Sequence, residues 1–289
     1  MFNTQQASIM VSLTLSQNNT ILIDTSYYVF HRYNATLKWF SFQKENDNID
    51  HSSLDTYAPF IDAFKKHVAK DMAKLVKRWK SGTNIIFCTD CPRSEIWRNN
   101  IYSEYKGTRV LSNTFNCGIF PIFYAMLEEN NYKVLSCNNL EADDVVYLMT
   151  KRLLEMPSYK MDIVIITNDN DYLQILAYND PTGEPRIHIH NMMSKNSDIS
   201  KRSKGHTDLL YKICLGDVSD NIPSIFPKLG AKTALKLANM DEAERDAYIQ
   251  SKGVACQNQY AMNKTLISFD CIPDALAQSL LSNIALTFV

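Results

Sequence analysis

Residues 162–171 read Asp-Ile-Val-Ile-Ile-Thr-Asn-Asp-Asn-Asp, four β-branched aliphatic residues followed closely by two aspartates. A short apolar run of this kind is typical of a buried strand in a parallel sheet. The same pattern occurs earlier, in Thr20-Ile-Leu-Ile-Asp24 and in Asn84-Ile-Ile-Phe-Cys-Thr-Asp90. Because ligands bind at the carboxyl ends of parallel strands, we expect these aspartates to share one edge of a sheet.

Segments with helical periodicity separate these runs, so strands and helices alternate along the chain. Helices are expected at residues 26–40, 57–79, 120–129 and from Leu140 onward, and further strands at residues 133–135 and 186–190. This order predicts an α/β protein with a mostly parallel sheet flanked by helices. After about Gly205 the strand pattern disappears, which predicts a helical C-terminal region.

Three parts are therefore predicted: a flexible tail at residues 1–19, a sheet domain at residues 20–204, and a helical subdomain at residues 205–289. The first 20 residues contain no charged side chain, so they lack the basic region of a secretory signal. No apolar run approaches the roughly 20 residues that span a bilayer. Seven cysteines without an extracellular spacing fit a reducing compartment. We expect an intracellular protein with no membrane partner.

Cys88 and Cys91 form a Cys-x-x-Cys pair around Asp90, which could suggest a zinc site. No second pair of Cys or His residues stands at a suitable distance, and Cys88 falls within a predicted strand. We interpret both cysteines as packing residues.

Nine carboxylates in five short groups follow predicted strand ends or begin predicted helices. They are Asp24, Asp90, Glu141, Asp143, Asp144, Asp169, Asp171, Asp217 and Asp220. Taken singly, each group could be an ordinary helix start or turn. Their recurrence favours metal binding, because clustered carboxylates repel one another and are costly to bury unpaired. Oxygen-only ligation indicates Mg²⁺ or Mn²⁺, and so a metal-dependent phosphoryl-transfer enzyme.

The net charge of −1 hides an uneven distribution. Apart from these nine carboxylates, the chain has 22 acidic residues and 30 basic ones. Basic residues cluster at 65–80, 93–109 and 195–204. A basic exterior around an acidic centre suits a polyanion that is cut there.

Seven motifs, in this order, resemble the flap-endonuclease superfamily of 5′-nucleases, particularly its phage and bacterial 5′–3′ exonuclease branch. They are Ile-Asp-Thr-Ser at 23–26, Thr-Asp at 89–90, Glu-Tyr-Lys-Gly-Thr-Arg at 104–109, Glu-Ala-Asp-Asp at 141–144, Thr-Asn-Asp-Asn-Asp-Tyr at 167–172, Leu-Gly-Asp-Val-Ser-Asp-Asn at 215–221 and Gly-Ala-Lys-Thr-Ala at 230–234. The resemblance covers about residues 20–275. It implies a PIN-like nuclease domain with a helix–hairpin–helix-type subdomain, acting in DNA replication or repair.

The resemblance also implies two Mg²⁺ or Mn²⁺ ions about 4 Å apart, which activate water and stabilise the leaving 3′-oxygen. The first ion would be bound by Asp24, Asp90, Glu141, Asp143 and Asp169. The second would be bound by Asp144, Asp171, Asp217 and Asp220, partly through water.

The basic motif residues have implied roles as well. Lys106 and Arg109 would reach the scissile phosphate from the base of a helical arch at about residues 98–130. Tyr105 would stack on the terminal base, and Arg98 would contact a phosphate. The duplex would be held by Lys212, Gly230, Lys232 and Thr233.

Two segments depart from the family pattern. The arch interior, residues 110–124, is short and apolar, which leaves open whether it forms a full gateway or a short cap. Ser224 and Pro227-Lys228 replace hairpin glycines, which leaves open the family's K⁺ site.

The implied substrate is branched or nicked duplex DNA with 5′ ends or flaps, cut by a monomer. One alternative substrate is the RNA of an RNA–DNA hybrid. A DNA-structure binding protein without catalysis is another class, but every motif position retains its carboxylate. A toxin-like ribonuclease would lack the extension at residues 205–289.

Overall fold

The structure is a computed structural model that describes residues 11–42, 53–109, 115–193, 198–203 and 205–288. At its centre is a five-stranded sheet in the order β4-β3-β2-β5-β6. The strands are β2 (Thr20–Asp24), β3 (Ile85–Cys88), β4 (Lys133–Leu135), β5 (Ile163–Ile166) and β6 (Ile187–His190). All neighbouring strands in this sheet run parallel, which confirms the predicted fold class.

The strand order reverses at β2, the strand from which the sheet grows in both directions. The chain first adds β3 and β4 on one side of β2, then crosses over and adds β5 and β6 on the other. Open α/β sheets bind ligands at the carboxyl ends of the strands beside such a reversal. Asp24 ends β2 and Asp169 follows β5, so these aspartates flank this point.

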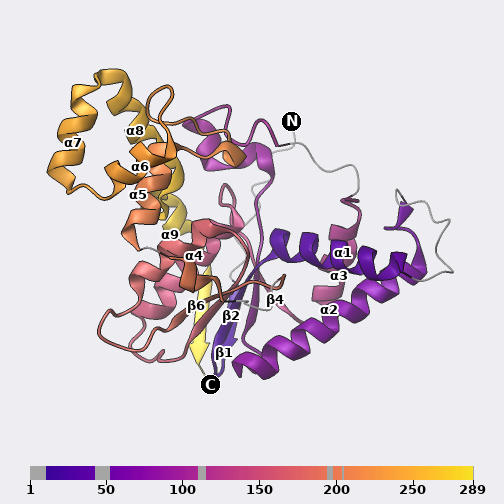
Figure 1. Cartoon of the computed structure of the whole chain (residues 1–289). Coiled ribbons are helices and arrows are strands. Elements are labelled where there is room, and N and C mark those ends of the chain that lie inside the picture. Colours follow the sequence, from indigo (N-terminus) through magenta and orange to yellow (C-terminus); the bar gives the residue numbers. More distant parts are fainter. Residues whose placement is uncertain (1–10, 43–52, 110–114, 194–197, 204, 289) are drawn as a thin grey trace, which may run out of the picture.

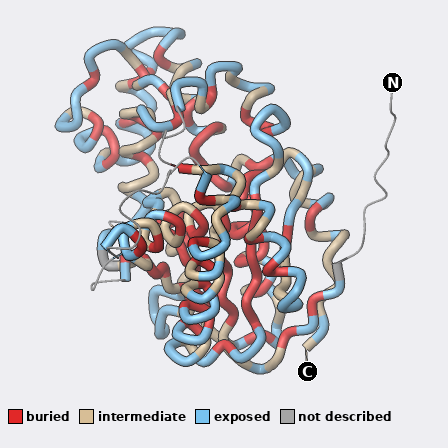
Figure 2. The backbone as a smooth tube through the Cα atoms, turned by 90° about the vertical axis from the view of Figure 1, so that its right-hand side faces the viewer, coloured by how far each residue is buried: buried red, intermediate tan, exposed pale blue. Residues whose placement is uncertain are grey.

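Helices cover both faces of the sheet. They are α1 (Thr25–Ser41), α2 (Ala58–Trp79) and α3 (Ile119–Glu129) on one face, and α4 (Ala142–Glu155), the 3₁₀ helix η5 (Asn170–Tyr178) and α9 (Asp274–Ser282) on the other. Figure 1 shows the two layers on opposite sides of the strands. In Figure 2 the buried residues run along the sheet between them. No described helix is both long and apolar enough to cross a membrane.

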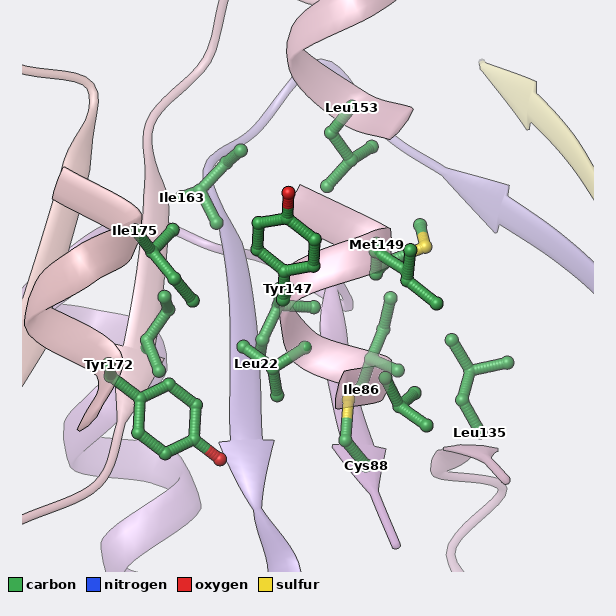
Figure 3. Packing of buried hydrophobic residues seen from close by; sticks show 14 of the residues in the cluster. Leu22, Ile86, Cys88, Leu135, Tyr147, Met149, Leu153, Ile163, Tyr172 and Ile175 are labelled. Atoms are coloured by element: carbon green, nitrogen blue, oxygen red, sulfur yellow. The ribbon is translucent and has the colours of Figure 1, made fainter. Parts of the chain in front are cut away.

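Side chains of each strand alternate between these two layers. Ile21 and Ile23 join the core beneath α1, α2 and α3, whereas Leu22 joins the core beneath α4. Figure 3 shows Leu22 packed near Tyr147 of α4. Cys88 belongs to this second core and is fully buried, as expected for a packing residue.

The C-terminal region forms a helical group at one end of the molecule (Figure 1). Its helices are α5 (His206–Leu215), α6 (Ala231–Ala238), α7 (Glu242–Ser251) and α8 (Val254–Ile267). They enclose a small apolar core that includes Leu237 and Ile249. Short 3₁₀ helices complete the described elements: η3 (Arg93–Glu95), η4 (Trp97–Asn100), η6 (Ile199–Arg202), η7 (Val218–Asp220) and η8 (Phe269–Cys271). The division of the chain at residue 204 stays a prediction.

A two-stranded parallel sheet corrects both predictions about the chain ends. Strand β1 (Val11–Leu15) pairs with β7 (Ile284–Phe288). Residues 11–15 are therefore not a flexible tail, and the C-terminal region is not wholly helical; residues 1–10 lie outside the described part. The physical reason is burial, because Leu13 and Leu15 pack into the core under α4.

Candidate metal centre and active site

Three aspartates at the ends of adjacent strands form the first part of the site. Asp24 ends β2, Asp90 follows β3 and Asp169 follows β5. Asp24 accepts hydrogen bonds from the backbone N–H of Tyr27 and from the hydroxyl of Tyr172, each at 3.0 Å. Burial, and then the charges of Asp90 and Asp169, raise the pKa of Asp24 to about 7. Asp90 and Asp169 are thus close enough to Asp24 to disfavour its charged form.

The start of α4 brings further carboxylates to the same edge. The backbone N–H of Ala142 donates a hydrogen bond to Asp90 at 2.9 Å, which ties this helix to the end of β3. Glu141, Asp143 and Asp144 each offer an oxygen within 4.8 Å of the others, and we call this set the first cluster. Burial, followed by the charges of Asp144 and Glu141, raises the pKa of Asp143 well above its usual value.

The second cluster consists of Asp171, Asp217 and Asp220, whose ligand oxygens also lie within 4.8 Å of one another. Asp171 lies in the first turn of η5, whereas Asp217 caps η7 and Asp220 ends it. Burial raises the pKa of Asp171 to about 6, although the neighbouring Lys212 opposes the shift. Sheet domain and helical region both contribute to this cluster.

Tyr105 connects the two clusters. Its hydroxyl lies 3.1 Å from Oε2 of Glu141 and 3.2 Å from Oδ2 of Asp220. The neighbouring Lys106 pairs with Glu141, and Arg109 contacts Asp220 at 2.5 Å. The backbone N–H of Lys106 also donates to the carbonyl of Asp220 at 2.9 Å. One short segment therefore fixes the spacing of the clusters.

Lys212 lies within the second cluster. Its ammonium group pairs with Asp171 and, at 2.6 Å, with Asp217. Burial opposes the charged form, but these two carboxylates outweigh it and hold the pKa of Lys212 above its usual value. The predicted phosphate contact is therefore, in this structure, a counter-ion of the acidic cluster.

The donor set fits divalent metal ions. Every candidate ligand is a carboxylate, the oxygen donor that hard cations such as Mg²⁺ prefer. Burial is the largest cause of the raised pKa values of Asp24, Asp143 and Asp171, and the charges of neighbouring carboxylates add to it. A bound cation would stabilise the charged form of these carboxylates.

The prediction that Arg98 contacts a phosphate is wrong, because the side chain is only 2% exposed. Its guanidinium group donates to Glu141 at 2.7 Å, to both oxygens of Asp144 at 2.7 and 2.9 Å, and to the carbonyl of Leu266 at 2.8 Å. Trp97 donates to Asp144 as well, at 3.0 Å. Asp144 thus belongs to the first cluster and pairs with Arg98. The prediction that Asp144 binds the second ion placed it in the other group.

Arg98 should therefore contribute mainly to stability. Arg98→Met would leave the buried Glu141 and Asp144 without their main counter-ion, so we expect a loss of about 3–5 kcal/mol in the free energy of unfolding. Urea unfolding of the metal-free protein measures this, with Arg152→Met as the control because Arg152 is exposed on α4. Equal stability of the two variants would contradict this assignment.

The predicted base-stacking role of Tyr105 is also wrong, because the residue is only 5% exposed. The ring packs with Ile96, Ile213 and Leu266 in an apolar core between the sheet domain and α5 and α8. A nucleic-acid base cannot reach a ring face covered in this way.

The predicted arch at residues 98–130 is wrong for its second half. Phe115, Ile119 and Phe123 are buried against α1 and α2, because this apolar stretch adds to the core instead of lining an opening. Residues 110–114 lie outside the described part of the chain.

The predicted duplex-binding residues lie at the start of α6. Gly230 caps this helix without a side-chain hydrogen bond, Gly230 and Lys232 are exposed, and Thr233 is half-buried. Backbone N–H groups at a helix start that no side chain caps can bind phosphate. In the preceding hairpin, Lys228 has a φ of 61°, a conformation that glycine adopts more readily. The role of these residues stays a prediction.

Sequence reasoning missed two residues that hold the carboxylates. The hydroxyl of Ser26 donates to Asp90 and that of Tyr172 to Asp24. Both residues lie inside the motifs at 23–26 and 167–172, so their position in these motifs could have identified them.

Beside the second cluster is a cavity of about 600 Å³, whose lining includes Asp171 and Tyr211.

The raised pKa of Asp24 predicts how the stability of the metal-free protein depends on pH. Folded Asp24 keeps its proton up to about pH 7, whereas the ordinary value is 3.8. Between these values the folded state binds more protons, so the free energy of unfolding falls as the pH rises. One pKa unit corresponds to about 1.4 kcal/mol. Asp24→Asn should therefore reduce the fall in the free energy of unfolding between these pH values by about 2–4 kcal/mol.

Urea unfolding in EDTA, at about pH 4 and about pH 8, measures this effect. Asp24→Asn should be more stable than the unmodified protein only at the higher pH. If both proteins lose the same stability between the two pH values, Asp24 is not the titrating group.

Comparisons with known proteins agree with this geometry. A family model described as "5'-3' exonuclease, N-terminal resolvase-like domain" matches residues 19–203. A 5′-3′ exonuclease of Buchnera aphidicola subsp. Schizaphis graminum is 30% identical over 227 residues, covering 75% of this chain and 68% of that protein. Ribonuclease H of Enterobacteria phage T4 is 26% identical over 219 residues, covering 69% of each chain.

Solved structures share the fold. The bacteriophage T5 D15 flap endonuclease, in a pseudo-enzyme–product complex with DNA and metal ions, aligns with a TM-score of 0.57 and 15% identity, over 92% of this chain and 98% of that one. A T5 5′-exonuclease with bound zinc aligns with a TM-score of 0.54 and 16% identity, over 92% of each chain.

Proposed function

Because the chain belongs to the 5′–3′ exonuclease family, we propose that its carboxylate clusters bind two Mg²⁺ or Mn²⁺ ions and cut DNA near junctions of duplex and 5′ single strand. Membership makes the chain a metal-dependent nuclease, a hydrolase of phosphodiester bonds. The identity of the ions, their number and the preferred DNA structure are the proposed parts.

The observation that carries this proposal is the pair of three-carboxylate clusters joined through the hydroxyl of Tyr105. Two adjacent sites of this kind match the needs of in-line phosphoryl displacement, which has an attacking and a leaving oxygen. The T5 enzyme with the same fold was crystallised with DNA and metal ions, which supports DNA as the substrate class.

When bound, the two ions would supply an activated water and stabilise the leaving oxygen. The protein's own residues have separate tasks. Glu141 and Asp143 of the first cluster, with the strand-end carboxylates Asp24 and Asp169, would hold one ion, while Asp171 and Asp217 would hold the other. Tyr105 keeps the clusters at a fixed separation, because its hydroxyl contacts both.

Lys106 and Arg109 would bind the scissile phosphate. Each now pairs with one cluster carboxylate, Glu141 or Asp220, for which a metal ion would compete. This competition would release the side chains of Lys106 and Arg109. Their positive charge beside the metal ions would then stabilise the negative charge that develops on the phosphate during displacement. The same competition for Asp171 and Asp217 would free Lys212 to contact a neighbouring phosphate.

Cleavage of four end-labelled substrates tests the proposal: a 5′-flap duplex, a nicked duplex, an RNA–DNA hybrid and plain single-stranded DNA, each with Mg²⁺, with Mn²⁺ and with EDTA. We expect cleavage at the flap junction with either ion and none with EDTA. Equal cleavage of plain single-stranded DNA would remove the junction from the proposal.

The RNA strand of a hybrid is the second candidate substrate, because the T4 relative is named a ribonuclease H. Preferential cleavage of the hybrid over the flap would favour it. The carboxylate chemistry would be the same in both cases.

A further inference from the structure

A second polar recess, of about 310 Å³, lies between α1, α2 and the end of β6. Its lining includes three cations, Arg32, Lys74 and Arg78, against a single carboxylate, Asp71. The other titratable residue of the lining is His190. The lining of the recess is therefore mainly basic, in contrast to the acidic metal centre.

The single carboxylate is already occupied. Asp71 pairs with the guanidinium of Arg32 and accepts a hydrogen bond from the hydroxyl of Tyr28 at 3.1 Å. It is 4% exposed, so it serves as an internal anchor that orients Arg32. Among the described residues, Lys74 makes no ion pair, and its charge is therefore available to a ligand.

Two buried nitrogen atoms on residues that line the recess lack hydrogen-bond partners among the described residues: Nε of Arg32 and Nδ1 of His190. His190 is 6% exposed, and burial, followed by the charge of Arg78, lowers its pKa to about 4 despite the nearby Asp198. A neutral imidazole can still donate one hydrogen bond from Nδ1. Unsatisfied buried polar atoms are costly, and a ligand oxygen in the recess would supply partners for these two.

The recess lies at the same edge of the sheet as the metal centre. His190 ends β6, and the side chain of the next residue, Asn191, donates a hydrogen bond to Asn168, beside Asp169. Two strand spacings separate β6 from β2, or about 10 Å. His190 and Asn191 thus place one wall of the recess at the sheet edge that carries the metal centre.

We propose that this recess binds a phosphate group, contacted by Lys74 and Arg78 at its rim and by Arg32 and His190 within. The phosphate comes either from the nucleic-acid strand that passes the metal centre or from a free nucleotide. A phosphate from the nucleic-acid strand would depend on the proposed nuclease function, whereas the ability to bind a phosphate depends on the recess alone. Three cations with directed N–H donors suit a tetrahedral oxyanion.

The double variant Lys74→Ala/Arg78→Ala tests the proposal, because both residues are exposed on α2 and alanine favours a helix. Lys77→Ala is the matched control, since Lys77 is exposed on the same helix but does not line the recess. Binding of a fluorescent 5′-flap DNA is followed in Ca²⁺ over a range of KCl concentrations. Each lost phosphate contact should lower the salt slope by about 0.9.

A strand phosphate predicts a slope reduced by about 1–2 in the double variant, and a smaller change in Lys77→Ala. A free nucleotide predicts instead an unchanged slope, but an NMR shift of the His190 ring on addition of dAMP or inorganic phosphate that the double variant loses. An unchanged slope together with no such shift overturns the proposal.

Cleavage at saturating DNA, measured in the same variants, separates this inference from the nuclease function. If cleavage persists while both binding effects are absent, the recess proposal fails alone. If the unmodified protein cuts no nucleic acid, the nuclease proposal fails, and the phosphate titration still tests the recess.

Discussion

Asp169→Asn and Asp171→Asn should each lower metal-dependent cleavage by about 10³-fold or more, because each removes a charged ligand while preserving the shape of the side chain. A lost metal contact costs several kcal/mol of transition-state stabilisation, and 1.36 kcal/mol corresponds to a factor of ten in rate. Asp171 has a pKa raised to about 6, mainly by burial, so its loss relieves a desolvated charge in the metal-free protein. Folding should therefore survive or improve.

Single-turnover cleavage of a 5′-flap in Mg²⁺ measures the rate, and urea unfolding in EDTA measures the stability. Asp180→Asn is the control, because Asp180 is exposed and caps a turn around Thr182. A variant at Asp169 that cleaves as fast as the unmodified protein would rule out the two-metal hypothesis.

Lys106→Ala should lower the single-turnover rate by roughly 10²-fold while Kd for DNA rises only slightly, comparable to the loss of one strong electrostatic donor. Lys106 pairs with Glu141 and is held by its own backbone hydrogen bond to Asp220. Its φ of 54° is unusual for a lysine, so the backbone holds this side chain at the metal centre.

Arg109→Ala should behave in the same way, with a smaller effect because Arg109 is about half exposed. Lys160→Ala serves as the control for charge loss at an exposed position. A large loss of affinity with an unchanged single-turnover rate would instead make Lys106 an ordinary phosphate-binding residue.

Local pattern predicted most of the sheet and its helices. The strand at Thr20–Asp24 and the short strand at Lys133–Leu135 begin and end where they were expected. Helix α2 begins one residue later than predicted and ends at Trp79 as predicted. These elements carry their own signal, because a fully buried strand must be apolar along its length and a helix on a sheet must be apolar along one face.

Features set by distant partners could not be predicted. Arg98 looks like a surface cation in the sequence, yet it contacts the carbonyl of Leu266, 168 positions later. Tyr105 and Lys212 were expected to face nucleic acid, but contacts with Asp220 and Asp171 place them inside the acidic centre. A sequence motif can predict which residues lie close together, but it does not predict which of them are buried.

The pairing of β1 with β7 has a consequence for biosynthesis. Residues 11–15 are synthesised long before their partner strand, which ends at Phe288. At about 5–20 residues per second, β1 waits roughly 14–55 s for that partner. During this time β1 lacks the hydrogen-bonding partner that β7 later supplies, and an unpaired strand edge is the form in which chains associate with one another. Nascent chains therefore expose one unpaired strand edge until translation reaches Phe288.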